Sequence, residues 1–186
     1  MKTIAQRGKH RGSVAPGTLR KIDTIAPRKA IALLEWCIAQ DLHQEHYNEK
    51  PTCRFEKFWG TGVSLYAGGL NKIYPGSPIA AEAVLMDLCE DYYPQANSIL
   101  LYRYAVGASI AEHCDRPCWD RKVVLINLVD ASPNLFGEKP FTRFKFDGCN
   151  HLLGDGDVIE FDSRTLHGIP AVKHTRYSLQ LRRIAQ

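Results

Sequence analysis

The chain has 186 residues, of which 45% are hydrophobic and 24% charged, and its formal net charge at pH 7 is +4. This length suits one globular domain that buries a sizeable core without disulfides. No apolar run approaches the length of a membrane span and the N-terminal stretch is basic and polar, so we expect neither a membrane-spanning nor a secreted protein.

The N-terminal residues carry Gly and Pro without periodicity, which predicts a flexible basic arm over residues 1–25 and a single domain over residues 26–186. The basic side chains of this arm are Lys2, Arg7, Lys9, Arg11, Arg20 and Lys21. Such an arm can bind nucleic-acid phosphates, or it can be a solvated tail. The sequence leaves both open.

Two helices are predicted in the first half of the chain. The first covers residues 28–42 after Pro27, with apolar side chains at helical spacing at Ile31, Leu34, Ile38 and Leu42. The second covers residues 78–92, with an apolar face made by Ala81, Val84, Leu85 and Leu88. Between the two helices, the Gly-rich and aromatic segment 51–75 predicts short strands and loops.

From residue 97 onward the pattern changes to short strands separated by Gly, Pro and Asp turns. The expected strands are Ile99–Tyr104, Val123–Val129, Phe141–Phe146, Val158–Phe161, Leu166–Val172 and Tyr177–Ile184. Helices dominate one half and strands the other, so the predicted fold class is α+β.

His113 and Asp115 stand two residues apart, so on a strand both side chains point to the same face. His167, on a later segment, can supply a third ligand to the same metal ion. Two histidines and one carboxylate leave coordination positions open, which is typical of non-haem Fe(II) oxygenases. The alternative is that each is an ordinary polar residue without a ligand.

Arg176 and Arg182 are separated by an even interval, so on the last strand they share a polar face with Ser178 and Gln180. Two guanidinium groups suit a dicarboxylate such as 2-oxoglutarate, because each can hold a carboxylate with two hydrogen bonds. The alternative is a pair of solvated cations on an edge strand.

Six cysteines occur in a chain too long to need a disulfide framework, so we expect reduced thiols and a cytoplasmic protein. A zinc site at Cys114 and Cys118 is the alternative, but this pair has no second pair nearby.

Three stretches resemble those of a known family. They are Leu101–Gly107 leading into His113-Cys114-Asp115, Gly156–Ile159 leading into Leu166–Ile169, and Arg176–Arg182. Together they resemble the AlkB family of Fe(II)- and 2-oxoglutarate-dependent dioxygenases, over about residues 93–183. The resemblance implies a double-stranded β-helix, or jelly-roll, core buttressed by the N-terminal helices. It also implies Fe(II), 2-oxoglutarate and O2 as cofactor and co-substrates.

The resemblance also implies roles for single residues. Arg176 would hold the distal carboxylate of 2-oxoglutarate, Arg182 would lie at the metal-proximal end, and Tyr104 would hydrogen-bond the co-substrate. Asn127 stands among apolar residues of a predicted strand and needs a hydrogen bond if buried. The cofactor pocket can provide that bond, and the same reasoning makes Ser178 a candidate.

The substrate implied by the family is a nucleobase in nucleic acid or a nucleotide, hydroxylated or demethylated. A substrate lid is expected at about residues 54–74, where Tyr66 can stack on a base and Arg54, Lys57 and Lys72 can meet phosphates. Tyr102, Arg116 and Trp119 are further substrate candidates. The stretch Arg116-Pro117-Cys118-Trp119 departs from the family, which often has acidic residues there.

Two alternatives remain. The same iron site can serve a hydroxylase of small molecules or protein side chains. A jelly-roll module that binds metal without turnover is the other, although the complete set of two histidines, one aspartate and two arginines argues against it. Nothing in the sequence indicates an obligate protein partner.

Overall fold

The strands of the chain pair across long sequence distances into two sheets. In the computed structural model, which describes residues 14–47, 50–65 and 71–184, one eight-stranded sheet has the order β1-β10-β7-β12-β5-β3-β2, with β4 paired to β3. A four-stranded sheet has the order β6-β11-β8-β9. The strands are β1 Leu19–Thr24, β2 His43–Tyr47, β3 Lys50–Leu65, β4 Asn71–Pro75, β5 Ser98–Tyr104, β6 Ile110–His113, β7 Lys122–Asp130, β8 Thr142–Phe146, β9 Cys149–Leu153, β10 Asp157–Asp162, β11 His167–Ile169 and β12 Thr175–Arg182.

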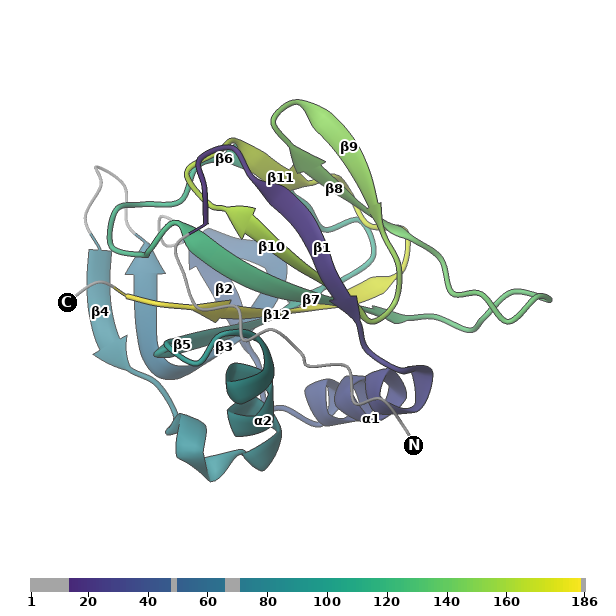
Figure 1. Ribbon diagram of the computed structural model, residues 1–186, viewed down its shortest axis with the longest axis horizontal. Helices are drawn as coiled ribbons and strands as arrows, with labels where there is room; N and C mark the ends of the chain where they lie inside the picture. Colours follow the sequence, from purple (N-terminus) through teal and green to yellow (C-terminus); the bar gives the residue numbers. More distant parts are fainter. Residues whose placement is uncertain (1–13, 48–49, 66–70, 185–186) are drawn as a thin grey trace, which may run out of the picture.

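The two sheets face each other in a jelly roll, and both helices lie beneath the larger sheet (Figure 1). Side chains alternate along its central strands. On β12, Tyr177, Leu179 and Leu181 pack toward the helices, whereas the alternate polar side chains face the space between the sheets. The predicted α+β jelly-roll class is confirmed, and this alternation directs the polar face of β12 into the interior.

Helix α1 (Pro27–Ile38) and helix α2 (Ala83–Tyr92) bury apolar stripes against the larger sheet, and a short 3-10 helix, Ile79–Ala81, precedes α2. The buried stripe of α1 consists of Ala30, Leu33, Leu34 and Cys37. The predicted face of α1 was therefore wrong in part, because Ile31 and Ile38 are about half exposed. The helix also ends earlier than predicted, and β2 begins soon after it.

A strand occupies part of the expected flexible arm. Residues Leu19–Thr24 form β1, which pairs antiparallel with β10. Arg20 forms an ion pair with Glu160 at 2.8 Å and Lys21 one with Asp157 at 2.6 Å. The expectation of a free arm was therefore wrong for these residues, because their partner strand lies far along the chain. Residues 1–13 lie outside the described part.

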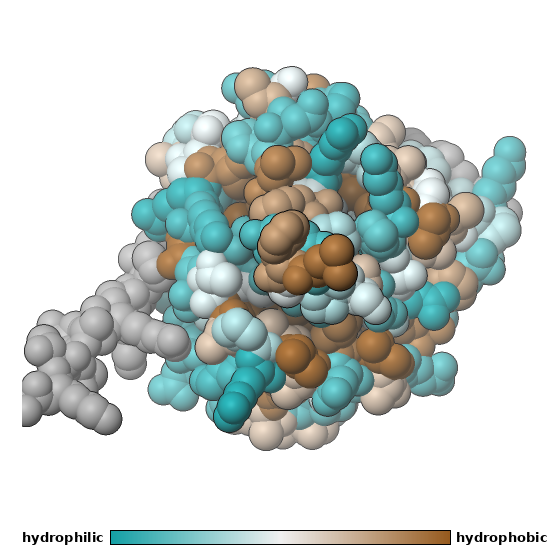
Figure 2. Space-filling view, turned by 90° about the vertical axis from the view of Figure 1, so that its right-hand side faces the viewer, coloured by the Kyte–Doolittle hydropathy of each residue, from teal (hydrophilic) through white to brown (hydrophobic). Residues whose placement is uncertain are grey.

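The loop between β7 and β8 projects from the body of the molecule (Figure 1). Leu135 and Phe136 at its tip are exposed, while the Asn134 side-chain oxygen accepts hydrogen bonds from the amides of Phe136 and Glu138. Figure 2 views the molecule from this side and shows apolar patches among hydrophilic side chains. Within the described residues, no helix is long and apolar enough to cross a membrane.

Candidate metal centre and its cavity

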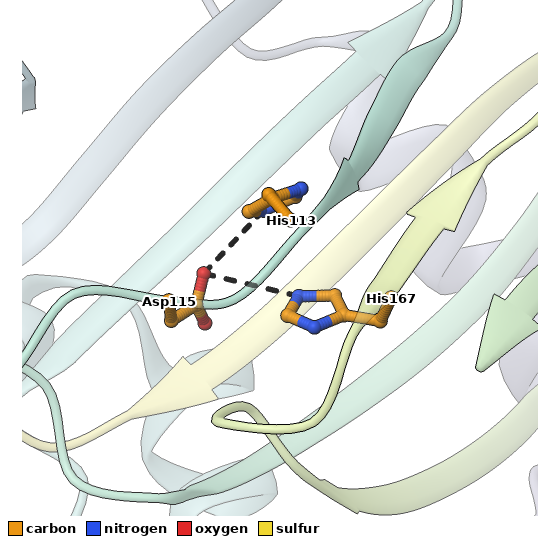
Figure 3. Close-up of side chains that lie close together, drawn as sticks. All are labelled: His113, Asp115 and His167. Carbon is orange, nitrogen blue, oxygen red and sulfur yellow. Dashed lines mark ion pairs between the residues drawn. The ribbon is translucent and has the colours of Figure 1, made fainter. Parts of the chain in front are cut away.

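Two strands and the turn after one of them bring three metal-ligating side chains together (Figure 3). His113 ends β6 and faces His167, the first residue of β11, in the antiparallel register. Their Nε2 atoms lie 3.5 Å and 3.8 Å from Asp115 Oδ1, respectively. The three ligand atoms all lie within 4.8 Å of one another, a spacing that a single ion can bridge.

Asp115 lies beyond the end of β6, so strand alternation alone does not place it. Its amide donates to the carbonyl of Ser163 at 2.7 Å, which fixes the turn after His113 against the segment that leads to His167. The predicted grouping of His113, Asp115 and His167 is present. It depends on this backbone hydrogen bond between two loops as well as on the strand.

Backbone carbonyls orient both imidazoles. His113 Nδ1 lies 2.8 Å from the carbonyl of Ala111, and His167 Nδ1 lies 2.8 Å from that of Thr165. Because a carbonyl only accepts, each Nδ1 carries a proton, which leaves Nε2 as the nitrogen available to a metal ion. Burial lowers the pKa of His167, although Asp115 acts in the opposite direction, so its neutral, metal-binding form is favoured.

Arg182 holds the carboxylate of Asp115. Its Nη1 donates to Asp115 Oδ2 at 2.5 Å, while Nε and Nη2 donate to Gln180 Oε1 at 2.9 Å and 2.7 Å. Burial raises the pKa of Asp115, but Arg182 and both histidines outweigh it and hold that pKa far below its usual range. The carboxylate is therefore ionised, with Oδ1 left to face the histidines. Two imidazoles and one carboxylate fit Fe(II) with open coordination positions.

Arg176 offers two unmatched donors. Its side chain is buried, with Nε donating to Asn127 Oδ1 at 2.7 Å and the guanidinium 5.0 Å from the Tyr104 ring centre. Among the described residues, its Nη1 and Nη2 have no hydrogen-bond partner. Buried donors require acceptors, and two parallel guanidinium N–H groups match a carboxylate. The residues present therefore fit the distal carboxylate of 2-oxoglutarate.

One cavity joins the metal ligands to Arg176. It has a volume of about 460 Å³, within the range of small-molecule sites, and it is lined by all three ligands, by Arg176 and by Arg182. Four other predicted residues also line it, namely Tyr102, Tyr104, Arg116 and Trp119.

Asn127 and Ser178 do not line this cavity, unlike the expectation. The Asn127 amide donates to the carbonyls of Leu153 and Gly154 at 3.3 Å and 2.8 Å. Ser178 Oγ accepts from Gln180 Nε2 at 3.3 Å. Both are buried, and they accept hydrogen bonds from Arg176 and Gln180, respectively. Tyr66 lies outside the described residues.

Sequence reasoning missed Glu45 and misplaced Arg54, both of which line the cavity, whereas Gln180 lines it together with Arg176 and Arg182, with which it shares the predicted polar face. Arg54 was expected on a lid, in contact with phosphates, but it is 7% exposed. The expected lid region consists largely of β3 and β4, a hairpin whose first strand continues into the larger sheet. No local signal marks Glu45, since its burial depends on the pairing of β2 with β3.

No family model matches the chain, and no curated protein matches its sequence. Solved structures match its fold. OsALKBH1 shares 14% identity at a TM-score of 0.58, over 92% of this chain and 100% of that one. An oxidoreductase of the 2OG-Fe(II) oxygenase family from Burkholderia pseudomallei shares 14% identity at a TM-score of 0.54, over 84% and 77%.

A prolyl hydroxylase from Trichoplax adhaerens, in complex with a peptide of hypoxia inducible factor, shares 12% identity at a TM-score of 0.54, over 90% and 82%. At such low identities these matches show a common fold. They confirm the double-stranded β-helix that the AlkB resemblance implied.

Proposed function

We propose that the protein is an Fe(II)- and 2-oxoglutarate-dependent dioxygenase. The observation that carries the proposal is a single cavity that holds a His-Asp-His ligand set and the buried, unmatched guanidinium of Arg176. The fold shared with 2OG-Fe(II) oxygenases supports it. Both sheets contribute to this cavity, which supports one catalytic domain made of residues 26–186 together with β1.

Each group in the cavity has a role in this chemistry. His113, Asp115 and His167 would hold Fe(II), and Arg176 would hold the distal carboxylate of 2-oxoglutarate. Arg182 keeps Asp115 ionised and oriented at the metal end. When bound, Fe(II) with 2-oxoglutarate and O2 supplies an oxidant that hydroxylates C–H bonds. Tyr104 packs over Arg176 and limits its motion.

For the substrate, we propose a nucleobase in nucleic acid or in a nucleotide, which is hydroxylated or demethylated. The AlkB resemblance and the fold shared with OsALKBH1 support this class. Tyr102, Arg116 and Trp119 offer ring faces and a cation at the cavity. The alternative is a small molecule or a protein side chain, which the fold shared with a prolyl hydroxylase supports.

The test is succinate formation by the Fe(II)-loaded protein with 2-oxoglutarate. Methylated oligonucleotides, nucleotides and small metabolites are supplied one at a time, with His167→Ala as the inactive control. We expect a methylated nucleobase to stimulate succinate formation. Stimulation by small metabolites alone would move the protein to the alternative class, and no 2-oxoglutarate binding at all would refute the proposal.

A further inference from the structure

A second buried arginine lines the cavity on the side formed by β2 and β3. The Arg54 side chain is 9% exposed, and its Nε and Nη2 both bind Glu45 Oε2, at 2.7 Å and 2.5 Å. Its Nη1 is buried and, among the described residues, has no hydrogen-bond partner. A buried N–H without an acceptor is uncommon and costs free energy, so this nitrogen indicates a missing ligand atom.

Glu45 fixes the direction of the Arg54 side chain, and both of its own carboxylate oxygens already accept hydrogen bonds. Its Oε2 accepts from Thr52 Oγ1 at 2.7 Å in addition to Arg54, and its Oε1 accepts from the Tyr102 hydroxyl at 3.0 Å. A carboxylate with this many donors has little capacity left for a ligand. Glu45 therefore acts as a support, and Arg54 Nη1 is the group that remains to bind.

Apart from the three metal-ligating groups, the fully buried side-chain atoms of the described cavity wall that lack a hydrogen-bond partner are all donors. Besides Arg176 they are Arg54 Nη1 and Trp119 Nε1, and both side chains are more than nine-tenths buried. A ligand that satisfies them must bring acceptors. Since one donor belongs to a guanidinium, an oxyanion satisfies it best through a charge-assisted bond.

Arg54 and Arg176 are held in opposite directions across the sheet, Arg54 by Glu45 on β2 and Arg176 by Asn127 on β7. Arg54 pairs with Tyr104 across β3 and β5, and Tyr104 pairs with Arg176 across β5 and β12. Two strand spacings separate the two backbones by roughly 10 Å. If 2-oxoglutarate, a five-carbon diacid, spans from Arg176 to the metal, Arg54 is available to bind a different molecule.

A second cavity, of about 420 Å³, adjoins the first through residues that line both, including Glu45, Tyr102 and Trp119. It is bounded by the β3–β4 hairpin, with Phe58 and Tyr74 in its wall. Arg54 lies beside this junction, next to Tyr102, whose ring centre is 5.4 Å from its guanidinium. The two cavities give room for a substrate larger than its reacting group.

We propose that Arg54, held by Glu45, is a specificity-determining residue that binds an oxyanion of the primary substrate, either a phosphate or a carboxylate. The inference rests on the proposed function, which assigns Arg176 and the metal to 2-oxoglutarate. The oxyanion lies where the two cavities meet, and the reacting group lies at the three metal ligands.

The experiment uses the Mn(II)-loaded protein saturated with 2-oxoglutarate, so that no turnover occurs. Two pairs of probes are titrated by calorimetry, adenosine 5′-monophosphate against adenosine and benzoate against benzamide. We expect the charged member of one pair to bind at least about tenfold more tightly than its neutral match. Preference for the phosphate identifies a nucleotide-like source, and preference for benzoate identifies a carboxylic acid.

In Arg54→Gln this preference should disappear while the affinity for 2-oxoglutarate stays unchanged. The double variant Glu45→Gln/Arg54→Gln avoids an unpaired buried carboxylate. It should also lose the preference for the charged probe and keep its affinity for 2-oxoglutarate. Arg20→Gln is the matched control, since Arg20 also pairs with a glutamate but lies outside the cavity. The proposal is overturned if wild type shows no preference, if the preference survives both variants, or if Arg54→Gln weakens 2-oxoglutarate binding.

Failure of the proposed function gives a different result. If the protein binds no 2-oxoglutarate, that function falls, and the same titrations are repeated in Arg176→Gln. In that background, Arg176 cannot bind the probes. A preference for the charged probe that is lost in Arg54→Gln then shows that Arg54 binds the oxyanion.

Discussion

At the scale of single residues, the backbone carbonyls of Ala111 and Thr165 orient the imidazoles of His113 and His167. Each carbonyl binds an Nδ1 proton, which leaves Nε2 as the nitrogen that a metal ion would use. We expect His167→Ala to lower the iron content well below one per chain and to abolish turnover, because two protein ligands hold Fe(II) weakly. Iron analysis and succinate assays measure this.

His151→Ala is the matched control, since His151 lies on β9, outside the metal group. It should keep full iron content. Normal iron content and activity in His167→Ala would remove that residue from the site.

Arg176 should dominate the binding of 2-oxoglutarate among residues outside the metal sphere. Charge-assisted hydrogen bonds contribute about 1.5–3 kcal/mol each, so Arg176→Ala should weaken 2-oxoglutarate binding at least about tenfold. Arg176→Lys should recover only part, because an ammonium group cannot form two parallel bonds. Titration of 2-oxoglutarate against the metal-loaded protein measures both.

Asn127→Ala tests a positioning role, because Asn127 touches Arg176 without lining the cavity. It should weaken 2-oxoglutarate binding less than Arg176→Ala does. Arg143→Ala, an exposed arginine on β8, should have no effect. Unchanged affinity in Arg176→Ala would mean that another residue anchors the acid.

At the scale of elements, the end of β10 ties three loops together. Asp162 accepts hydrogen bonds from Arg121, from the amides of Gly17 and Arg164, and from the Thr165 hydroxyl. Burial raises the pKa of Asp162, but these donors outweigh it and lower the pKa to about 2.

A lowered folded-state pKa stabilises the protein above the unfolded value of about 4, and this stabilisation is lost as the pH falls toward 2. Asp162→Asn should therefore reduce the free energy of unfolding by roughly 1–2 kcal/mol at pH 7, discounting for the half-exposed Arg121. The difference from wild type should shrink as the pH falls from about 4 to 2. Denaturant titrations at several pH values check this, and a constant difference would contradict it.

The strand β1 divides the basic N-terminal region into two parts with different expected effects. Deletion of residues 1–13 leaves β1 intact and, if these residues bind phosphates, should weaken oligonucleotide binding and its salt dependence. The Tm of this shorter deletion variant should match that of the wild-type protein. Deletion of residues 1–24 removes the partner of β10 and should lower the Tm. Equal oligonucleotide affinity in both deletions and in wild type would exclude a role for the basic region.

The elements differ in how far the sequence predicts them. Strands such as Val123–Val129 were predicted closely because their apolar runs need no partner to be recognised. Polar strands were not predicted. Strand β2 has the sequence His-Gln-Glu-His-Tyr, and it forms a strand because it pairs with β3. Arg54 and Glu45 belong to this second group, since only the pairing of β2, β3 and β5 buries them.

At the scale of the whole molecule, the predicted metal ligands and arginines come together because the jelly roll places β6, β11 and β12 around one interior. The spacing His113-x-Asp115 and the interval from Arg176 to Arg182 are local, so the sequence predicts them. Which residues form the opposite wall depends on the pairing of distant strands, and there the prediction placed Arg54 on a lid, whereas it lies buried on β3.

The position of β12 in the larger sheet bears on how the protein is made. This strand follows all the other strands in the sequence, yet it lies between β5 and β7 near the middle of the sheet. During synthesis, β5 and β7 therefore leave the ribosome with a vacant place between them, which only Thr175–Arg182 fills. Because Arg176 and Arg182 belong to that strand, we expect the sheet to close and the arginine end of the cavity to form in the same late folding step.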